Sequence, residues 1–426
     1  MKIESSPAIN KLIRPFIYSG TVILLIVIVW GCAAVPQLKE TPEATYVRLP
    51  FVRILLNDSR PEFTISGNHA ISLECIRDDR SVVYYASKPI TVSQDNGLIT
   101  ISMRTGRIGD RYNEIIVTPR DKNGLLEYDR KSYRGMFKIM TRGVNLQIVN
   151  YVHMDDYLKG VVPPEIGNVG EDEYEAIKAQ AVAARTYSMS HLAQYPDKPY
   201  DMKSDVSDQV YNGVEVEKEI VSKAIDDTRG CVIKYRDKLI NAYYHSTCGG
   251  NTDDIDEVWD KPSEPYLRAV ADSGYCSWSK YYHWRESYTA RQLQMRIEHY
   301  LSSDRGREIH IGDITDMYVK GRTAGGRVAE LTVQATDGSY TFGADRLRWV
   351  FLRSSNPELI LQSARFEIET KHDANGLLTR ADFIGGGYGH GVGMCQCGAI
   401  GMARQGKKFD QILKFYYTSV DITKIY

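Results

Sequence analysis

The sequence has no excess of either charge. Its 53 lysines and arginines are almost balanced by 54 aspartates and glutamates, so the net charge at pH 7 is −1. It also contains no long block of like charge. Nucleic-acid-binding domains usually carry a basic patch, and charged tails are built from blocks of one sign. We therefore expect neither a nucleic-acid partner nor a charged tail.

Internal repeats, low-complexity segments and a phosphate-binding loop are absent as well. The glycine-rich run at residues 385–393 lacks the Lys-Ser/Thr ending that a phosphate loop requires. The run is too rich in glycine for a helix or for the interior of a strand. Two interpretations stay open: a loop that approaches a ligand closely and displays His390 to a substrate, or a tight structural crossing.

What is present is enough apolar material for a sizeable core. The chain has 426 residues, 43 % of them hydrophobic, which suits two or three domains. Residues 46–130 consist of short β-branched segments separated by Asn, Asp and Gly, and they predict a small β-rich domain. Residues 131–426 mix predicted hairpins with helices at about 176–184, 217–228, 291–302, 344–351 and within 398–417. The predicted class is α+β with mostly antiparallel strands and a few packed helices.

The N-terminus predicts export. Lys2, Lys11 and Arg14 precede an uncharged run at residues 15–38, which is the pattern of a signal segment. Cys32 follows a small residue after the apolar core, as at the cleavage site of a bacterial lipoprotein. The alternative is an uncleaved signal anchor, because the run is as long as the ~20 residues that span a bilayer. Under either interpretation, residues 1–38 tether an extracytoplasmic protein to a membrane.

A candidate catalytic acid lies in the stretch at residues 156–187. Acidic residues at 171–175 and helix formers at 176–184 predict a helix with one narrow, small-residue face. Pro163 and Pro164 are expected to end any preceding regular element. Glu165 would then stand on a stiffened loop before the helix, either as a catalytic acid or as a capping or solvated glutamate.

This stretch resembles the stage II sporulation protein D family, also called the SpoIID/LytB domain. The resemblance continues through further blocks in the family's order, from about residue 131 to the C-terminus. They are Asp-Val-Ser-Asp-Gln-Val-Tyr-Asn-Gly at 205–213, Tyr-His-Ser-Thr-Cys-Gly-Gly at 244–250, Glu-Val-Trp at 257–259, Pro-Tyr-Leu at 265–267, Gly-His-Gly-Val-Gly-Met-Cys-Gln-Cys-Gly-Ala at 389–399 and Ile-Leu-Lys-Phe-Tyr-Tyr at 412–417. The resemblance implies a peptidoglycan substrate, and residues 131–426 as the catalytic domain. It also implies either lytic transglycosylase activity or stimulation of a cell-wall amidase.

The resemblance gives Glu165 the role of catalytic acid/base. A lytic transglycosylase needs few protein groups, because the primary hydroxyl of the muramic acid itself attacks the anomeric carbon. One glutamate with a raised pKa can serve as acid and then as base, and no cofactor is required for this chemistry. Arg185 could bind a substrate carboxylate or form a structural salt bridge.

A polar loop supplies further candidates for substrate binding. Asp208 and Gln209 could donate to or accept from sugar hydroxyls, and Tyr211 and His390 could contact the glycan. A cap or turn role for Asp208 stays equally open.

The cysteines allow two interpretations. His245 and Cys248 are three residues apart before a glycine pair, which is a credible zinc half-site that Cys276 could complete, with Cys395 as a possible fourth ligand. The alternative is a Cys248–Cys276 disulfide, which suits an exported protein.

Three functions follow from these residues. The first is a peptidoglycan lytic transglycosylase. The second is a non-catalytic wall-binding protein that enhances an amidase, and the third is a zinc-dependent wall hydrolase that uses His245, Cys248 and Cys276.

Fractionation of cells that express Cys32→Ala tests the lipoprotein interpretation. We expect the variant to differ from the wild type in size or in membrane association, because Cys32 would be both the cleavage boundary and the acylated residue. A variant with the size and membrane association of the wild type would instead support the uncleaved anchor.

Overall fold

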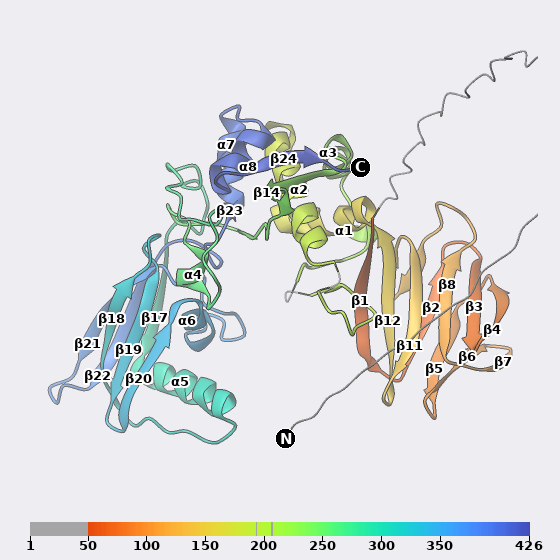
Figure 1. Cartoon of the computed structure of the whole chain (residues 1–426). Coiled ribbons are helices and arrows are strands. Elements are labelled where there is room, and N and C mark those ends of the chain that lie inside the picture. The colour runs from red at the N-terminus through yellow and green to blue at the C-terminus, as the bar shows by residue number, and fades with distance from the viewer. Residues whose placement is uncertain (1–49, 193, 206–207) are drawn as a thin grey trace, which may run out of the picture. The chain divides into compact units, whose positions relative to one another are not determined.

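The computed structural model describes residues 50–426 except 193, 206 and 207 (Figure 1). The predictions for residues 1–38, including lipidation at Cys32, lie outside the described residues. Within the described part, no helix is both long enough and apolar enough to cross a bilayer.

Two β-sheets that share one core form the N-terminal part of the described chain. The first has seven strands in the order β13 (Met202–Lys203), β1 (Phe51–Arg60), β12 (Asn145–His153), β11 (Met136–Arg142), β8 (Glu114–Pro119), β3 (Ile71–Arg77) and β4 (Arg80–Ala86). The second has six, in the order β10 (Lys131–Tyr133), β9 (Leu126–Tyr128), β2 (Glu62–Gly67), β5 (Ile90–Asp95), β6 (Leu98–Met103) and β7 (Gly106–Tyr112).

Alternation along the strands explains the shared core. In β3, Ile71, Leu73 and Cys75 are buried while the residues between them are partly exposed. A period of two directs these side chains to one face, where the second sheet covers them. The first sheet continues beyond residue 130 through the antiparallel hairpin β11–β12, which leads directly into the first helix.

The helical part is built around α2 (Tyr174–Ser190). It contacts α1 (Met154–Ile166), α3 (Glu219–Asp227), α7 (Gln396–Arg404), α8 (Phe409–Tyr416) and β14 (Cys231–Tyr235). The helix is confirmed, but burial is not confined to one narrow face, since every residue from Ala179 to Thr186 is buried. Helices buried all round need small side chains where neighbours approach closely, and the alanines of α2 meet that need.

The expectation that Pro163 and Pro164 end the preceding element is wrong. Both lie inside α1, which continues to Ile166 and places Glu165 in its last turn. A proline removes one helical hydrogen bond, so the carbonyl four residues earlier needs another donor. For Pro164 that carbonyl belongs to Gly160, and it accepts from the backbone N–H of Asn212 at 3.3 Å.

A second core lies in the segment that follows Cys276. It contains two three-stranded antiparallel sheets, one short helix and the longer α5 (Ala290–Arg305), which begins at a Thr289 capping box. The sheets are β17 (Trp284–Thr289), β22 (Leu378–Gly385) and β21 (Phe366–His372), and β18 (Ile314–Arg322), β19 (Val328–Ala335) and β20 (Gly338–Gly343), with α6 at Leu347–Val350.

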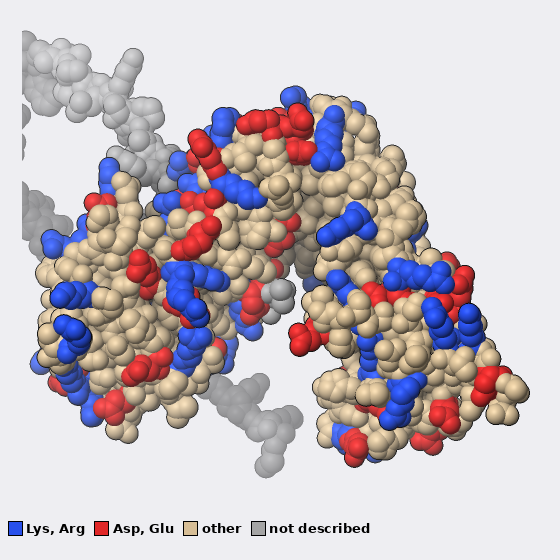
Figure 2. All heavy atoms as spheres, turned by 180° about the vertical axis from the view of Figure 1, so that it is seen from behind, with Lys and Arg blue, Asp and Glu red and all other residues tan. Residues whose placement is uncertain are grey.

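Two small sheets join distant parts of the chain. In one, β14 pairs with β15 (Lys238–Leu239) and with the C-terminal β24 (Asp421–Lys424). In the other, β16 (Tyr244–His245) runs parallel to β23 (Met394–Cys395), and α4 (Ile255–Val258) follows β16 along the chain. The predicted α+β class with mostly antiparallel strands is confirmed. Charges of both signs are interspersed on the face shown in Figure 2.

Gly160→Ala tests the close packing of α1. A Cβ at Gly160 would lie 2.6 Å from Cε2 of Tyr211 and 2.9 Å from the carbonyl oxygen of Gly213. We expect a loss of about 1–3 kcal/mol in the free energy of unfolding, measured by chemical denaturation, because overpacking forces neighbours to move. The matched control is Gly170→Ala, where φ is −123° and the nearest atom is 3.6 Å from the added Cβ. Equal losses in the two variants would contradict this account.

Candidate active site

Glu165 faces a cavity of about 300 Å³. The α1 helix supplies Glu165, the C-terminal half of α2 supplies Tyr187, and β16 supplies Tyr244. The remaining lining residues are Asp208, Gln209, Tyr243, Trp259 and His390. Segments that are far apart in sequence therefore surround one carboxyl group.

The pKa of Glu165 is raised to about 7 because the side chain, which is partly buried, is desolvated where it lines the cavity. A hydrogen bond with Gln396 acts in the opposite direction and lowers the pKa, but by less. Among the described residues, no lysine or arginine forms an ion pair with this carboxylate. A carboxyl group with a pKa near neutrality can both give and take a proton, as general acid-base catalysis requires.

Aromatic rings form one wall of the cavity. Trp259 contacts Tyr243 with ring centroids 5.0 Å apart, and it contacts His390 at 4.8 Å. Lys261 lies beside these rings. Its Nζ donates to the Tyr243 hydroxyl at 2.7 Å and lies 5.2 Å from the Trp259 ring centroid. A wall of this kind offers flat apolar faces to a sugar ring and a cation to a substrate carboxylate.

His390 lines the cavity as a neutral ring. Its Nδ1 accepts from the backbone N–H of Val392 at 3.1 Å, so its Nε2 carries the proton and donates to the carbonyl of Tyr244 at 2.9 Å. Burial lowers the pKa of His390 to about 4. Both ring nitrogens are engaged in hydrogen bonds with the backbone. The ring can therefore contact a ligand through its face but is not free to exchange a proton with it.

Gln209 and Asp208 also reach the cavity, but much of their polar capacity is used by the protein. The Oε1 atom of Gln209 accepts from Ser188 at 2.7 Å and from Tyr157 at 3.2 Å, and its Nε2 donates to the Tyr244 hydroxyl at 2.9 Å. Asp208 Oδ2 accepts from the backbone N–H of Lys203 at 2.8 Å. Gln209 therefore positions Tyr244, and Asp208 holds its own loop.

Arg185 and Tyr211, both predicted to bind substrate, lie away from this cavity. Arg185 is fully buried and donates to Asp155 at 2.9 Å and to the carbonyls of Ile225 and Cys231. This arrangement is a structural salt bridge, which was one of the two roles considered for Arg185 from the sequence. Tyr211 packs in the core and donates to Asn150 Oδ1 at 3.1 Å.

The proposed metal ligands separate in the structure. Cys248 and Cys276 lie together with Cys395 and with Asp272, a residue that the sequence did not single out. His245 is not in this group: its Nδ1 lies 3.2 Å from the carbonyl oxygen of Val392, and its buried Nε2 has no partner among the described residues. None of the four grouped residues lines the cavity at Glu165.

Five residues at this site were not predicted. Tyr187, Tyr243, Tyr244 and Trp259 line the cavity, and Gln396 contacts Glu165. All of these except Tyr243 lie inside the sequence blocks at 156–187, 244–250, 257–259 and 389–399, which is the signal that could have identified them.

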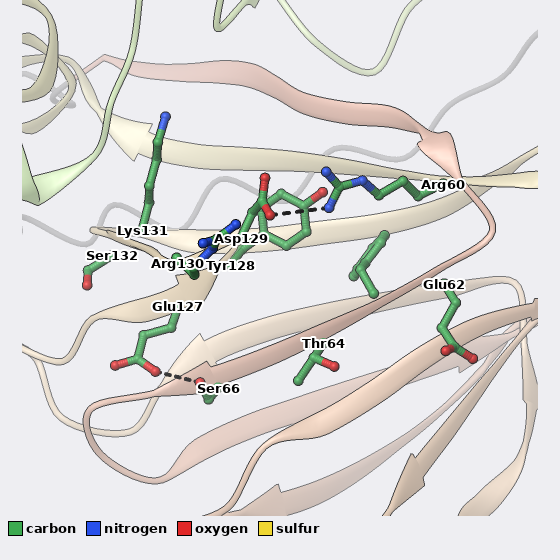
Figure 3. Close-up of a pocket in the computed structure, with 11 residues that line it drawn as sticks. Arg60, Glu62, Thr64, Ser66, Glu127, Tyr128, Asp129, Arg130, Lys131 and Ser132 are labelled. Atoms are coloured by element: carbon green, nitrogen blue, oxygen red, sulfur yellow. Dashed lines mark hydrogen bonds and ion pairs between the residues drawn. The ribbon is translucent and has the colours of Figure 1, made fainter.

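A larger cavity of about 500 Å³ lies on the six-stranded sheet, between β2 and the β9–β10 turn (Figure 3). Its carboxylates are already engaged. Glu127 accepts from Ser66 at 2.5 Å, Glu62 accepts from Ser93 at 2.6 Å, and Asp129 lies 3.3 Å from Arg60. The candidate acid with a raised pKa is therefore in the smaller cavity.

Two family models match the chain. Residues 142–235 match the stage II sporulation protein (SpoIID) model, and residues 274–393 match a domain of unknown function (DUF8618) that coincides with most of the second core. The first match confirms the resemblance found from the sequence and includes Glu165.

Several curated proteins are similar over longer stretches. An uncharacterized protein of Brachyspira hyodysenteriae is 29 % identical over 375 residues, which cover 87 % of this chain and 92 % of that protein. The stage II sporulation protein D of Bacillus subtilis is 29 % identical, over 65 % of this chain and 76 % of that protein. The amidase enhancer of Bacillus subtilis is 28 % identical over 62 % of this chain, but the match spans only 40 % of that protein.

Burial of Glu165 predicts a pH-dependent effect of Glu165→Gln on stability. Because the folded-state pKa of about 7 exceeds the unfolded value, the folded protein loses stability as pH rises between the two values. At about pH 4 both states are protonated, and the penalty is absent. Above pH 7 it reaches at most about 3.5 kcal/mol, since one pKa unit corresponds to about 1.4 kcal/mol, and solvent screening of this partly exposed group lowers it further. Glutamine does not titrate, so we expect the variant to gain stability over the wild type only at the higher pH.

Chemical denaturation at about pH 4 and about pH 8 measures this difference. Glu171→Gln is the matched control, because it makes the same change at an exposed position, where little effect is expected. An equal effect of Glu165→Gln at both pH values would contradict the burial argument.

Proposed function

The central part of this chain is a domain of the stage II sporulation protein D (SpoIID/LytB) family, and we propose that the protein is a peptidoglycan lytic transglycosylase. Membership of the family supports a role at the cell wall. The position of Glu165 in a cavity lined by aromatic side chains supports lytic transglycosylase activity. The observation that carries the proposal is the raised pKa of this one carboxyl group, near 7, without a cationic partner among the described residues.

The proposed reaction uses Glu165 twice. In its protonated form, Glu165 donates a proton to the glycosidic oxygen as the bond from the muramic acid anomeric carbon breaks. The resulting carboxylate then takes the proton of the muramic acid primary hydroxyl, whose oxygen attacks that carbon. The product carries a 1,6-anhydro ring, no water is consumed, and Glu165 ends protonated again. A pKa near 7 suits both steps, because neither protonation state is strongly disfavoured.

The other cavity residues have supporting roles in this proposal. Trp259 and Tyr243 would stack against sugar rings, and Lys261 would face a carboxylate of the muramic acid or of its peptide. His390 would contribute its neutral ring face. The tyrosine hydroxyl of Tyr244, held by Gln209, would orient the substrate beside Glu165. We further propose that the N-terminal segment holds this activity at the outer face of the membrane.

Two other functions were left open by the sequence. One is enhancement of a cell-wall amidase, which is based on the similarity to the amidase enhancer of Bacillus subtilis. An amidase would then be the protein partner. A zinc-dependent hydrolase is disfavoured, because a catalytic zinc needs an open position at the substrate. The grouped cysteines are buried, and none of them lines the cavity.

Product analysis of purified peptidoglycan after incubation with the protein tests the proposal. We expect anhydro-muramyl ends by mass spectrometry, and a rate that falls as pH rises above about 7, because Glu165 must start protonated. Glu165→Gln should lower the rate by about 100- to 10,000-fold, since it keeps the shape of the side chain but cannot transfer the proton. Peptidoglycan binding by this variant should be retained.

Each other product would identify a different function. Reducing muramyl ends would indicate hydrolysis, with Asp208 as the second carboxylate, and Asp208→Asn would then abolish it. Free stem peptides that appear only when an amidase is added would indicate an enhancer. Release of anhydro-muramyl ends by Glu165→Gln at the wild-type rate would disprove the assigned role, and Glu171→Gln serves as the control for an unrelated glutamate.

A further inference from the structure

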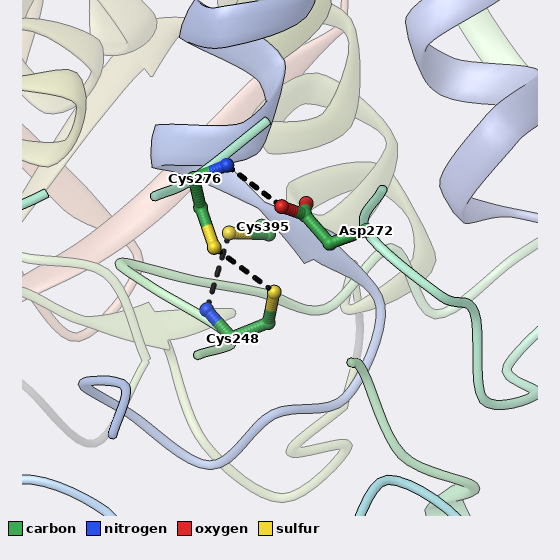
Figure 4. A group of neighbouring side chains, drawn as sticks. All are labelled: Cys248, Asp272, Cys276 and Cys395. Atoms are coloured by element: carbon green, nitrogen blue, oxygen red, sulfur yellow. Dashed lines mark hydrogen bonds between the residues drawn. The ribbon is translucent and has the colours of Figure 1, made fainter. Parts of the chain in front are cut away.

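Three cysteines and one aspartate from distant parts of the chain converge in the interior (Figure 4). Cys248 follows β16, Asp272 and Cys276 lie in the turns before the second core, and Cys395 ends β23 and caps α7. The sulfur atoms and a carboxylate oxygen of these residues all lie within 4.8 Å of one another, and all four side chains are buried. The Cys248 and Cys276 sulfurs are 3.4 Å apart.

Backbone donors point at this group. The N–H of Gly250 lies 3.4 Å from Cys248 Sγ, and Cys395 Sγ accepts from the N–H groups of Cys248 at 3.2 Å and Gly398 at 3.3 Å. Cys395 also stands at the N-terminal end of α7, where a first-turn N–H group points at its sulfur atom. Three backbone N–H groups are therefore directed at two of the three sulfur atoms.

Asp272 completes a donor set that lacks a counter-charge. Its carboxylate is fully buried, accepts from the N–H of Cys276 at 2.7 Å and from the Tyr416 hydroxyl at 2.5 Å, and forms no ion pair with any described residue. Its oxygen atoms are thus held beside the three sulfur atoms, where a bound cation would stabilise them. A Cβ at Gly398 would lie 2.2 Å from Asp272 Oδ1, so glycine is what lets the carboxylate approach the first turn of α7.

A disulfide accounts for only part of this arrangement. Joining Cys248 to Cys276 would leave Cys395 and Asp272 buried beside the disulfide without a part in it. Four donors within 4.8 Å of one another, three of them sulfur, are a set that zinc prefers over magnesium or calcium.

We propose that Cys248, Asp272, Cys276 and Cys395 bind one structural zinc ion. All four positions of a tetrahedral site are then filled by the protein, and none of these residues lines the cavity at Glu165. The ion therefore does not take part in the chemistry. Its place is behind the cavity wall, where it joins three segments that local sequence does not hold together.

The zinc would position the candidate active site through neighbouring residues. Cys395 is followed directly by Gln396, whose side chain contacts Glu165 and lies 3.3 Å from Gln180 of α2. The same strand pairs with β16, which carries Tyr244 into the cavity. Gln396 is thus adjacent in sequence to the proposed ligand Cys395, and Tyr244 lies on the strand that pairs with the strand of Cys395.

Metal analysis of the purified full-length protein tests the proposal without relying on activity. We expect about one zinc per chain, and in cobalt-exchanged protein the visible and near-ultraviolet bands of tetrahedral thiolate coordination. Cys276→Ser and Asp272→Asn should each lower the bound zinc at least several-fold in the presence of a chelator. Cys75→Ser and Cys231→Ser are the matched controls, because both cysteines lie outside the group, and both variants should keep the ion.

Peptide mapping after alkylation of the denatured wild type keeps the test independent of whether a variant folds. We expect Cys248, Cys276 and Cys395 all to be alkylated once the metal is removed. A Cys248–Cys276 disulfide in zinc-free protein would overturn the proposal, and so would three free thiols with no bound metal. Zinc that persists in both Cys276→Ser and Asp272→Asn would also overturn it.

Discussion

The close approach of α1 to α2 is the packing on which the candidate site depends. Alanines along α2 bring the two helices together, and the buried pair Arg185–Asp155 joins them near the start of α1. At the other end of α1, Glu165 is partly withdrawn from water and has no ion-pair partner among the described residues. A raised pKa is the direct consequence of this desolvation.

The rest of the cavity is built from segments that meet only in the folded chain. Two histidines contact the backbone of Val392: His390 accepts from its N–H, and His245 Nδ1 lies against its carbonyl oxygen. Gln209 joins α1, α2 and β16 through three side-chain hydrogen bonds. The three hydrogen bonds of Gln209 and the two of His390 hold these side chains in one orientation, so the wall around Glu165 is preorganised.

Local signals in the sequence predicted many elements correctly. The helix formers of α2, the segment that becomes α5 and the hairpins β11–β12 and β19–β20 were recognised, because helix propensity and alternation act over a few residues. The two prolines inside α1 led to a wrong prediction, because they were expected to end a regular element there. Their cost is offset at least in part by Asn212, which supplies a donor to the carbonyl of Gly160 from more than fifty residues away.

The sequence by itself determined the class of fold, the family and the identity of Glu165 as the residue to consider. Those inferences rest on short motifs and on periodicity, which need no knowledge of distant contacts. The tertiary structure alone decided that Arg185 and Tyr211 are buried in the core and that Asp272, rather than His245, stands beside the three cysteines. It also decided the pKa of Glu165, because desolvation depends on which side chains cover the carboxyl group, and those come from segments far along the chain.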